Sequence, residues 1–377
     1  MSFYEVIEQY KDFDFDKYWE NVTDYDVLRS LEKDKLDHND VLNLLSPTAE
    51  KHLEAMAQKA HRISIQNFGR ALTLYTPMYI ANYCENHCVY CGYNCHSGIK
   101  RKKLSMEEID KECQAIAEQG FKHILILTGE SENMSSVEYI GEAVNLSTKY
   151  FPSIGIEVYP MSVEGYKHLV ENGAEGLTVY QETYNEEMYK KVHIKGPKAN
   201  YKWRLDAPER GAKAGMRTLT LGALLGLYKW RTDAFFTILH GEYLKDHYPY
   251  IELSYSAPRI RPFKGCFEGL MEVTDINMVQ AMLVMRLFDP HAGLNVSTRE
   301  NLETRKHIIP FGVTKLSAGV STDVGGHSQN EHDTAQFEPN HDCEVPEVTA
   351  MLKEIGYQHV FKDWERFDYT ARSQKKR

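Results

Sequence analysis

Three cysteines stand within eight residues of this sequence, in the stretch Cys84-Glu-Asn-His-Cys88-Val-Tyr-Cys91. Thiolates at such close spacing bind soft metals. A cluster of four irons takes four thiolates, so three cysteines leave one iron without a protein ligand and open to another molecule. The alternative is a structural zinc ion, which could complete four ligands with Cys95 and a nearby histidine. Zinc sites usually draw on two separated pairs of ligands, so this single short loop favours the iron cluster.

The composition limits what kind of protein can carry this loop. The chain has 377 residues, of which 44 are basic and 54 acidic, giving a net charge of −10. The length suits one large barrel or two ordinary domains. The negative charge argues against nucleic acid or an anionic membrane as the main partner. No apolar run comes near 18 residues, so no membrane span is expected. Seven cysteines, three of them in one loop, fit a reducing cytoplasm better than a disulfide framework.

From residue 71 onward, short apolar runs alternate with amphipathic stretches, which is typical of βα units and a parallel sheet. Helix-start signals lie between the runs, such as the capping box formed by Ser105 and Glu108. The sequence predicts an α/β fold of the (β/α)8 TIM-barrel type, with an incomplete six-strand barrel as the alternative. The eight strands are expected at residues 72–80, 123–128, 155–159, 176–181, 218–224, 251–256, 293–298 and 313–318.

The segments outside this repeat are expected to be helical. Residues 1–70 carry apolar positions at helical spacing and are predicted to form an N-terminal helical cap on a barrel that spans residues 71–327. Residues 328–377 are expected to add one helix, from Pro346 to Trp364, and an extended tail.

With Tyr90 just before its last cysteine, the loop resembles the motif of radical S-adenosylmethionine (SAM) enzymes. The resemblance implies that Cys84, Cys88 and Cys91 hold a [4Fe-4S] cluster, and that the amino acid end of SAM occupies the fourth iron. Cys95 is additional to the motif. Because Cys95 on the fourth iron would exclude SAM, we interpret it as a bystander.

Barrel active sites lie at the C-terminal ends of the strands. The second expected strand ends in Thr128-Gly129-Glu130, which resembles the GGE-like motif that binds the amino group of SAM. Glycine lets a backbone approach a ligand closely, and a glutamate accepts hydrogen bonds from an ammonium group. The alternative is an acidic residue at a helix start.

The next two strands also end in candidate residues. Glu157 lies in an apolar strand and needs a partner if it is buried, so it is either a ligand contact or an exposed edge residue. Glu182, with Arg204 about 22 residues later, resembles a subgroup in which the glutamate binds the ribose of SAM and the arginine binds its carboxylate. The alternative for Arg204 is an exposed charge on a helix.

The last two strands are expected to face the substrate. Arg299 and Ser317 are the candidates for holding the carboxylate of an amino acid. The aromatic amino acid lyases of this superfamily, which the sequence resembles, point to the same two places. The alternative for Arg299 is a local ion pair with Glu300 at a helix start.

Residues 71–327 resemble the 2-iminoacetate synthases, which are the tyrosine lyases of thiamine biosynthesis. Matching pieces extend over nearly the whole chain and include CENHCVYCGY, LTGE, VYQETY, LGALLGL, PRIRP, LSTRE and DVGG. The resemblance implies reductive cleavage of SAM to methionine and a 5′-deoxyadenosyl radical, which takes a hydrogen atom from the amino group of L-tyrosine. Cleavage of the Cα–Cβ bond then gives 2-iminoacetate and p-cresol. The resemblance also implies a reductant such as flavodoxin or ferredoxin, and handover of the product to thiazole synthase.

Two other functions remain as alternatives. The tyrosine lyase of hydrogenase cofactor assembly carries a C-terminal extension with three cysteines for a second cluster. Here only Cys266 and Cys343 lie beyond the first half of the barrel, so that enzyme is the second candidate. A zinc-stabilised binding protein without catalysis is a candidate from another class, and it predicts a colourless protein on which SAM has no effect.

Overall fold

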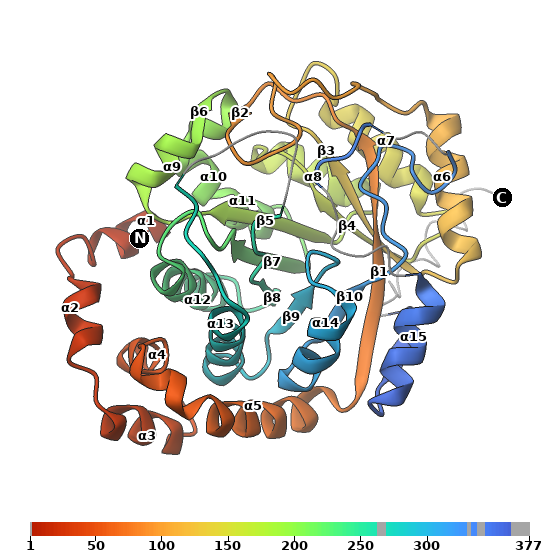
Figure 1. The fold of residues 1–377 in the computed structure, drawn as a ribbon. Helices are drawn as coiled ribbons and strands as arrows, with labels where there is room; N and C mark the ends of the chain where they lie inside the picture. Colours follow the sequence, from red (N-terminus) through yellow and green to blue (C-terminus); the bar gives the residue numbers. More distant parts are fainter. Residues whose placement is uncertain (1, 262–268, 330–332, 338–343, 363–377) are drawn as a thin grey trace.

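Eight parallel strands enclose one interior in the computed structural model, which describes residues 2–261, 269–329, 333–337 and 344–362 (Figure 1). Each strand pairs with the next one along the barrel, and β10 returns to pair with β1, placing Ser317 opposite Tyr75. The (β/α)8 barrel and its eight expected strands are therefore confirmed, and the six-strand alternative is wrong. The strands are β1 (Ala71–Ala81), β3 (His123–Thr128), β4 (Ser153–Glu157), β5 (Gly176–Glu182), β7 (Thr218–Ala223), β8 (Glu252–Ser256), β9 (Gly293–Val296) and β10 (Lys315–Ser317).

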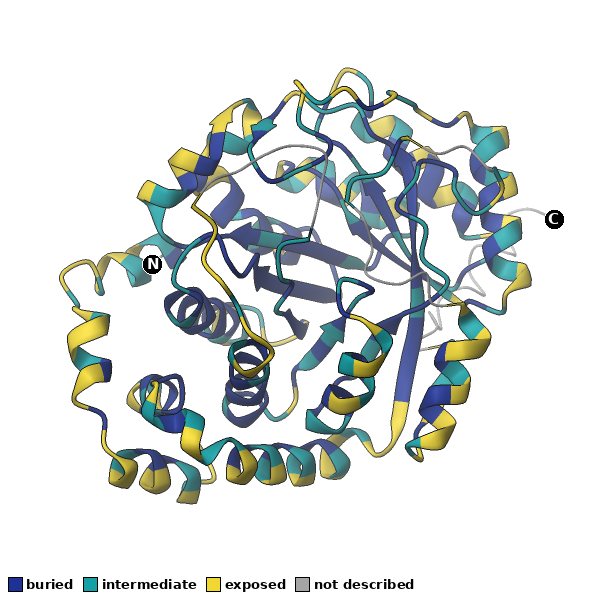
Figure 2. Ribbon diagram, in the orientation of Figure 1, coloured by how far each residue is buried: buried dark blue, intermediate teal, exposed yellow. Residues whose placement is uncertain are grey.

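Helices form the outer layer around these strands. The expected capping box at Ser105 is present at the start of α6. The side chains of Ser162 and Thr274 likewise accept a hydrogen bond from a backbone N–H in the first turn of α8 and α13. The strands are mainly buried, and the helices expose their outward faces (Figure 2). The barrel helices are α6 (Met106–Glu118), α7 (Val137–Ser147), α8 (Val163–Asn172), α9 (Glu186–Val192), α10 (Tyr201–Leu205), α11 (Ala207–Lys213), α12 (Trp230–His247), α13 (Asp275–Phe288) and α14 (Leu302–Ile308), with short 3-10 turns η2 (Pro197–Ala199) and η3 (Ile309–Phe311).

The N-terminal segment is helical, as predicted, and packs against the barrel helices α12 and α13. Phe3 stacks on His240 of α12, with 4.1 Å between the ring centroids. The Gln280 side chain on α13 donates hydrogen bonds of 2.8 Å to the carbonyls of Leu44 and Ser46. The division of the chain at residues 70 and 327 stays a prediction. The elements of this segment are α1 (Phe3–Glu8), α2 (Phe15–Glu20), α3 (Asp24–Glu32), α4 (His38–Leu44), η1 (Thr48–His52) and α5 (Leu53–Phe68).

Three short strands were not expected. β2 (His87–Cys88) and β6 (His193–Lys195) form a small antiparallel sheet at the cysteine loop. β11 (Gln358–Val360) adds to the start of β1. Each has only two or three residues, too few to show an alternating pattern.

The predicted C-terminal helix is too long. It is α15 (Val345–Glu354), and the chain turns at Gly356, whose φ of 77° is left-handed and ends the helix. Trp364, where the helix was expected to end, lies outside the described residues. No helix in the described part of the chain is long and apolar enough to cross a membrane.

Candidate functional site

The cysteine loop lies between the end of β1 and the start of α6, and the β2–β6 pair holds it. Cys88 is the β2 residue opposite His193, and the amide of Val89 donates to the carbonyl of Val192 at 3.1 Å. Cys88 is buried, Cys84 and Cys91 are half-buried, and Cys95 is exposed. The loop therefore turns its three motif cysteines inward.

The donors around these thiols fit an iron–sulfur cluster. Burial raises the pKa of Cys84 and of Cys88, and the charge of neighbouring cysteines adds to both shifts, so thiolates here require a metal to balance them. The side-chain amide of Asn86 lies 3.7 Å from the sulfur of Cys84, and that of Gln336 lies 3.8 Å from the sulfur of Cys91. Amide donors to sulfur are one means by which proteins tune such clusters.

A single zinc ion needs a different arrangement of ligands from that of an iron–sulfur cluster. It requires its ligands around one point, whereas each thiolate of a [4Fe-4S] cluster binds a different iron. Across the described ranges, no three His, Cys, Asp or Glu side chains are grouped as one metal ion needs.

The end of β3 packs directly against the loop. The amide of Gly129 donates to the carbonyl of Ala81 at 2.9 Å, and a Cβ at Gly129 would lie 2.3 Å from the carbonyl oxygen of Tyr83. Gly129 is thus required for the approach of the loop backbone, a contact that the motif alone did not reveal. Glu130 accepts a hydrogen bond of 2.7 Å from Asn86, so its carboxylate faces the start of the loop.

A buried cluster of charges lies on the other side of the loop. Glu182 has a left-handed φ of 72° and accepts hydrogen bonds from Lys198 at 2.6 Å and from Arg204 at 3.4 Å. Arg204 also donates to the carbonyl of Tyr180 at 2.7 Å and is buried, so the alternative of an exposed helix charge is wrong. Burial acts to raise the pKa of Glu182, but the charges of Lys198 and Arg204 outweigh it and hold that pKa below its usual value.

Tyr90 is anchored by a histidine. Its hydroxyl lies 2.7 Å from Nε2 of His193, whose Nδ1 lies 2.9 Å from the carbonyl of Tyr189. Burial, reinforced by the charges of Lys198 and Arg204, keeps the pKa of His193 well below its usual value. The imidazole is therefore neutral, with Nδ1–H donating and Nε2 accepting the tyrosine proton.

Sequence reasoning missed Asn86, His193 and Lys198 as members of the site. Asn86 lies within the cysteine motif but between its fixed positions, and the other two follow β5 without a recognisable spacing. Only the three-dimensional packing brings them to the loop.

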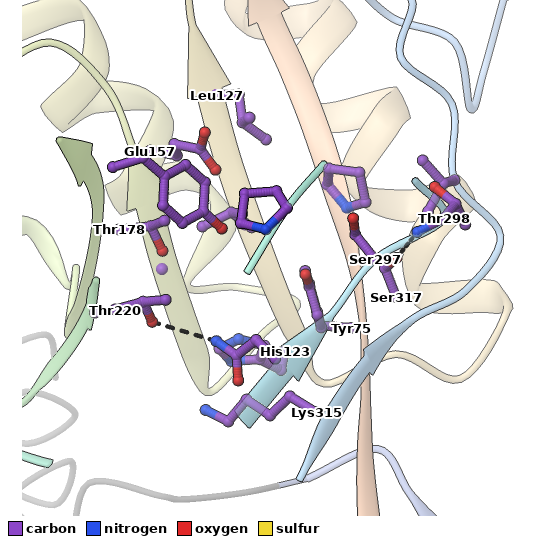
Figure 3. Close-up of a pocket in the computed structure, with 18 of the residues that line it drawn as sticks. Tyr75, His123, Leu127, Glu157, Thr178, Thr220, Ser297, Thr298, Lys315 and Ser317 are labelled. Atoms are coloured by element: carbon purple, nitrogen blue, oxygen red, sulfur yellow. Dashed lines mark hydrogen bonds between the residues drawn. The ribbon is translucent and has the colours of Figure 1, made fainter. Parts of the chain in front are cut away.

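A cavity lies inside the barrel, and Gln336, whose amide lies beside the sulfur of Cys91, is one of the residues that line it. Glu157 on β4 and Ser317 on β10 line it (Figure 3). Arg299, in the turn after β9, lines it as well. Burial raises the pKa of Glu157 to about 7, even though Arg299 counteracts part of this effect. Because β4 lies between β3 and β5 and Glu157 lines the cavity inside the barrel, the alternative of an exposed edge position is wrong.

Arg299 and Ser317 occupy one corner of the cavity. Glu300 pairs with Arg259, Nε to Oε1 at 2.9 Å, so the predicted alternative of a local ion pair between Arg299 and Glu300 is wrong. The Arg299 guanidinium lies over the ring of Phe337 at 4.0 Å. The hydroxyl of Ser317 accepts the amide of Thr298 at 3.0 Å, so Ser317 supports the turn that presents Arg299.

Comparison with known proteins agrees with this geometry. The Radical SAM superfamily model matches residues 78–235, and the Biotin and Thiamin Synthesis associated domain matches residues 256–358. The chain is 39% identical to the 2-iminoacetate synthase of Salmonella typhimurium, over 90% of both chains. It is 38% identical to the 2-iminoacetate synthase of Escherichia coli, over 91% of both chains.

A solved structure gives the same answer about the fold. The chain is similar to the crystal structure of HydG, a maturase of the [FeFe]-hydrogenase, with a TM-score of 0.88 and 28% identity over 94% of this chain and 80% of that one. The identity to the two bacterial enzymes is higher and covers as much of their length as of this chain. The chain belongs to the 2-iminoacetate synthase family of the radical SAM superfamily.

Proposed function

We propose that this protein cleaves the Cα–Cβ bond of L-tyrosine to give 2-iminoacetate and p-cresol, consuming SAM. One observation supports this most directly: Gln336, whose side-chain amide lies 3.8 Å from the sulfur of Cys91, lines the same barrel cavity as Glu157, Arg299 and Ser317. The identity of 39% to a 2-iminoacetate synthase supports the choice of substrate.

The cofactors are assigned to the loop and the charges around it. Cys84, Cys88 and Cys91 hold a [4Fe-4S] cluster. When bound, the cluster and SAM together supply a 5′-deoxyadenosyl radical that removes a hydrogen atom from the amino group of tyrosine. The groups assigned to SAM come from the ends of successive strands and from the loop, and they are Tyr90, Gly129, Glu130, Glu157, Glu182 and Arg204.

The protein's own side chains orient the two small molecules. Arg204 is a fixed, buried guanidinium, suited to the carboxylate of SAM, and Glu182 with its left-handed backbone is suited to a ribose hydroxyl. Arg299 pairs with the carboxylate of tyrosine, and Ser317 keeps the Arg299 turn in place. The enclosed barrel excludes water from the reacting atoms.

We assign the protein two partners and a compartment on chemical grounds. 2-Iminoacetate hydrolyses easily, which favours direct transfer to thiazole synthase, and the cluster needs a one-electron reductant such as flavodoxin or ferredoxin. Three closely spaced cysteines in one loop and an exposed Cys95 suit a reducing cytoplasm.

The test is an anaerobic assay of the reconstituted protein with SAM, a strong reductant and L-tyrosine, analysed by mass spectrometry. We expect both 5′-deoxyadenosine and p-cresol. 5′-Deoxyadenosine without p-cresol would contradict tyrosine as the substrate and would direct attention to other aromatic amino acids. A protein that holds iron but yields neither product would contradict SAM cleavage.

A further inference from the structure

Glu182 stands in a turn whose backbone shape depends on its surroundings. The pairing of β5 with β7 is irregular between Tyr180 and Glu182, and the φ of Glu182 is 72°. A residue with a Cβ keeps this left-handed conformation only where the surrounding structure fixes it. Because the direction of the Glu182 side chain follows from its backbone, the groups that hold the turn also decide where the carboxylate points.

The carboxyl group of Asp233 on α12 holds one side of this turn. Its Oδ1 accepts a hydrogen bond of 3.0 Å from the hydroxyl of Thr183 and one of 2.8 Å from the amide of Tyr184. The Thr183 oxygen itself accepts the amide of Asn185 at 3.2 Å, and its own proton goes to Asp233. One oxygen atom of Asp233 therefore fixes the two residues that directly follow Glu182.

Asp233 makes these bonds from a costly position. The side chain is fully buried, and burial raises its pKa to about 7, although the hydrogen bonds from Tyr184 and Thr183 act in the opposite direction. Its Oδ2 has no hydrogen-bond partner among the described residues, and no cation offsets the burial. A buried carboxyl group with so little compensation lowers stability. Its side-chain bonds all go to the turn after Glu182, which is where its contribution lies.

The helix that carries Asp233 is a firm support for the turn. Residues 232–241 of α12 are all buried (Figure 2). Nδ1 of His240, seven residues after Asp233 and thus on the same helix face, lies 3.1 Å from the hydroxyl of Tyr184. The ring of Phe3 covers His240 in turn. The helix therefore holds Tyr184 at both its backbone amide and its hydroxyl.

The other side of the turn is held by Arg204. Its Nε donates to the carbonyl of Tyr180 at 2.7 Å, and its Nη2 lies 3.4 Å from Oε1 of Glu182. With Asp233 on the far side, the backbone is fixed both before and after Glu182. A hydroxyl group that donates to Glu182 needs this fixed position, because a hydrogen bond weakens steeply when its partners are misaligned.

We propose that Asp233 is a positioning residue for the ribose of SAM: it holds Thr183 and Tyr184 so that Glu182 presents its carboxylate to a ribose hydroxyl. The inference rests on the proposed function, which assigns Glu182 to the ribose. The role needs one acceptor oxygen and no negative charge, because both hydrogen bonds end on Oδ1. Asparagine keeps that oxygen and should replace aspartate, whereas leucine has a similar shape and no acceptor.

The test is anaerobic calorimetry of the reconstituted protein, without reductant, with SAM and with a SAM analogue in which hydrogen replaces both ribose hydroxyls. We expect the parent protein to prefer SAM by about 10-fold or more. Asp233→Leu should weaken SAM binding by about 10-fold or more and change binding of the analogue by less than about 2-fold. Asp233→Asn should bind SAM within about 3-fold of the parent protein.

The matched control is Gln280→Leu. Gln280 is buried on α13, and its side chain also makes two hydrogen bonds, to the carbonyls of Leu44 and Ser46. The control therefore loses as many bonds as Asp233→Leu, but these hold the N-terminal segment and not the turn after Glu182. It should keep the parent ratio of the two affinities. A general fold defect weakens both ligands together, so this ratio separates positioning from stability.

A parent-like ratio in Asp233→Leu would overturn the inference, and so would an Asp233→Asn variant as weak as the leucine variant. If Asp233→Leu does not fold, Thr183→Val removes one of the two bonds with little change in shape and should lower the ratio by about 3-fold or more; an unchanged ratio there would also overturn the inference.

Two further outcomes separate this inference from the proposed function. A parent protein that binds SAM and the analogue equally, yet forms p-cresol, would overturn the positioning role and leave the proposed function standing. A parent protein that prefers SAM, loses this preference in Asp233→Leu and forms no p-cresol would support the positioning role and overturn the proposed function.

Discussion

Replacing Glu182 by glutamine should destabilise the protein strongly even without its cofactors. The carboxylate lies 2.6 Å from the Lys198 ammonium and 3.4 Å from the Arg204 guanidinium, and the three side chains are 9%, 14% and 10% exposed. Glutamine is nearly the same size but leaves two buried cations without their counter-charge. Breaking a buried ion pair from one side costs about 3–5 kcal/mol. We therefore expect the unfolding free energy of the apoprotein to fall by an amount in that range.

Chemical denaturation of the apoprotein, followed by circular dichroism, measures this change. The matched control is Glu186→Gln, because Glu186 pairs with Lys190 at 2.9 Å on the surface and should cost no more than about 1 kcal/mol. Adding Lys198→Met to the Glu182 variant should recover part of the loss, since it removes one unpaired cation. A loss below 1 kcal/mol for Glu182→Gln, equal to that of the control, would refute our account of this cluster.

The remaining predictions concern pH, the loop and the substrate corner. The pKa of Glu182 is lower in the folded protein, so the stabilisation from its charge is complete above the pKa of an unfolded glutamate, about 4.3, and is lost as pH falls through the folded value. The difference in unfolding free energy between the parent and Glu182→Gln should therefore shrink in acid. A difference that stays constant with pH would contradict this. Cys88→Ala should abolish the cluster absorbance and the bound iron, whereas Cys95→Ala should leave both intact, as measured by iron analysis. Gly129→Ala forces a Cβ to within 2.3 Å of a backbone carbonyl, so we expect about 1–3 kcal/mol of destabilisation and weaker SAM binding. Unchanged stability and SAM affinity would show that the loop can move aside, and would contradict this prediction. Arg299→Met should weaken tyrosine binding by at least 10-fold with iron content and SAM affinity unchanged, as measured by calorimetry.

The barrel could be predicted because its strands are separate apolar runs that alternate with helix-start signals. This pattern can be recognised in short stretches of the sequence. The candidate residues at the strand ends followed from the barrel, since its C-terminal face is where such side chains meet. Glu157 and Arg299 illustrate the limit of this reasoning. The sequence also allowed an exposed position for Glu157 and an ion pair of Arg299 with Glu300. Only the structure shows that Glu157 lines the cavity and that Glu300 pairs with Arg259. Contacts such as Tyr90 with His193 join residues 103 positions apart, and no local pattern encodes them.

The sequence also did not predict that His123 and Lys315 line the cavity inside the barrel. His123 begins an apolar strand and Lys315 lies in another, and in a single strand such residues look like ordinary exposed ends. Their meaning depends on the closure of β10 on β1, which turns alternate side chains of all the strands toward one space.

The small β2–β6 sheet reduces the conformational freedom of the cysteine loop before the cluster binds. A free loop of the length between β1 and α6 would lose considerable conformational entropy when three of its side chains are fixed on one cluster. Here the pairing of Cys88 with His193, together with the contact of Gly129 on the loop backbone, restricts that freedom while the chain folds. Folding therefore removes part of this entropy, and binding of the cluster has less of it left to remove. The β2–β6 pair thus orders the loop in advance for its cofactor.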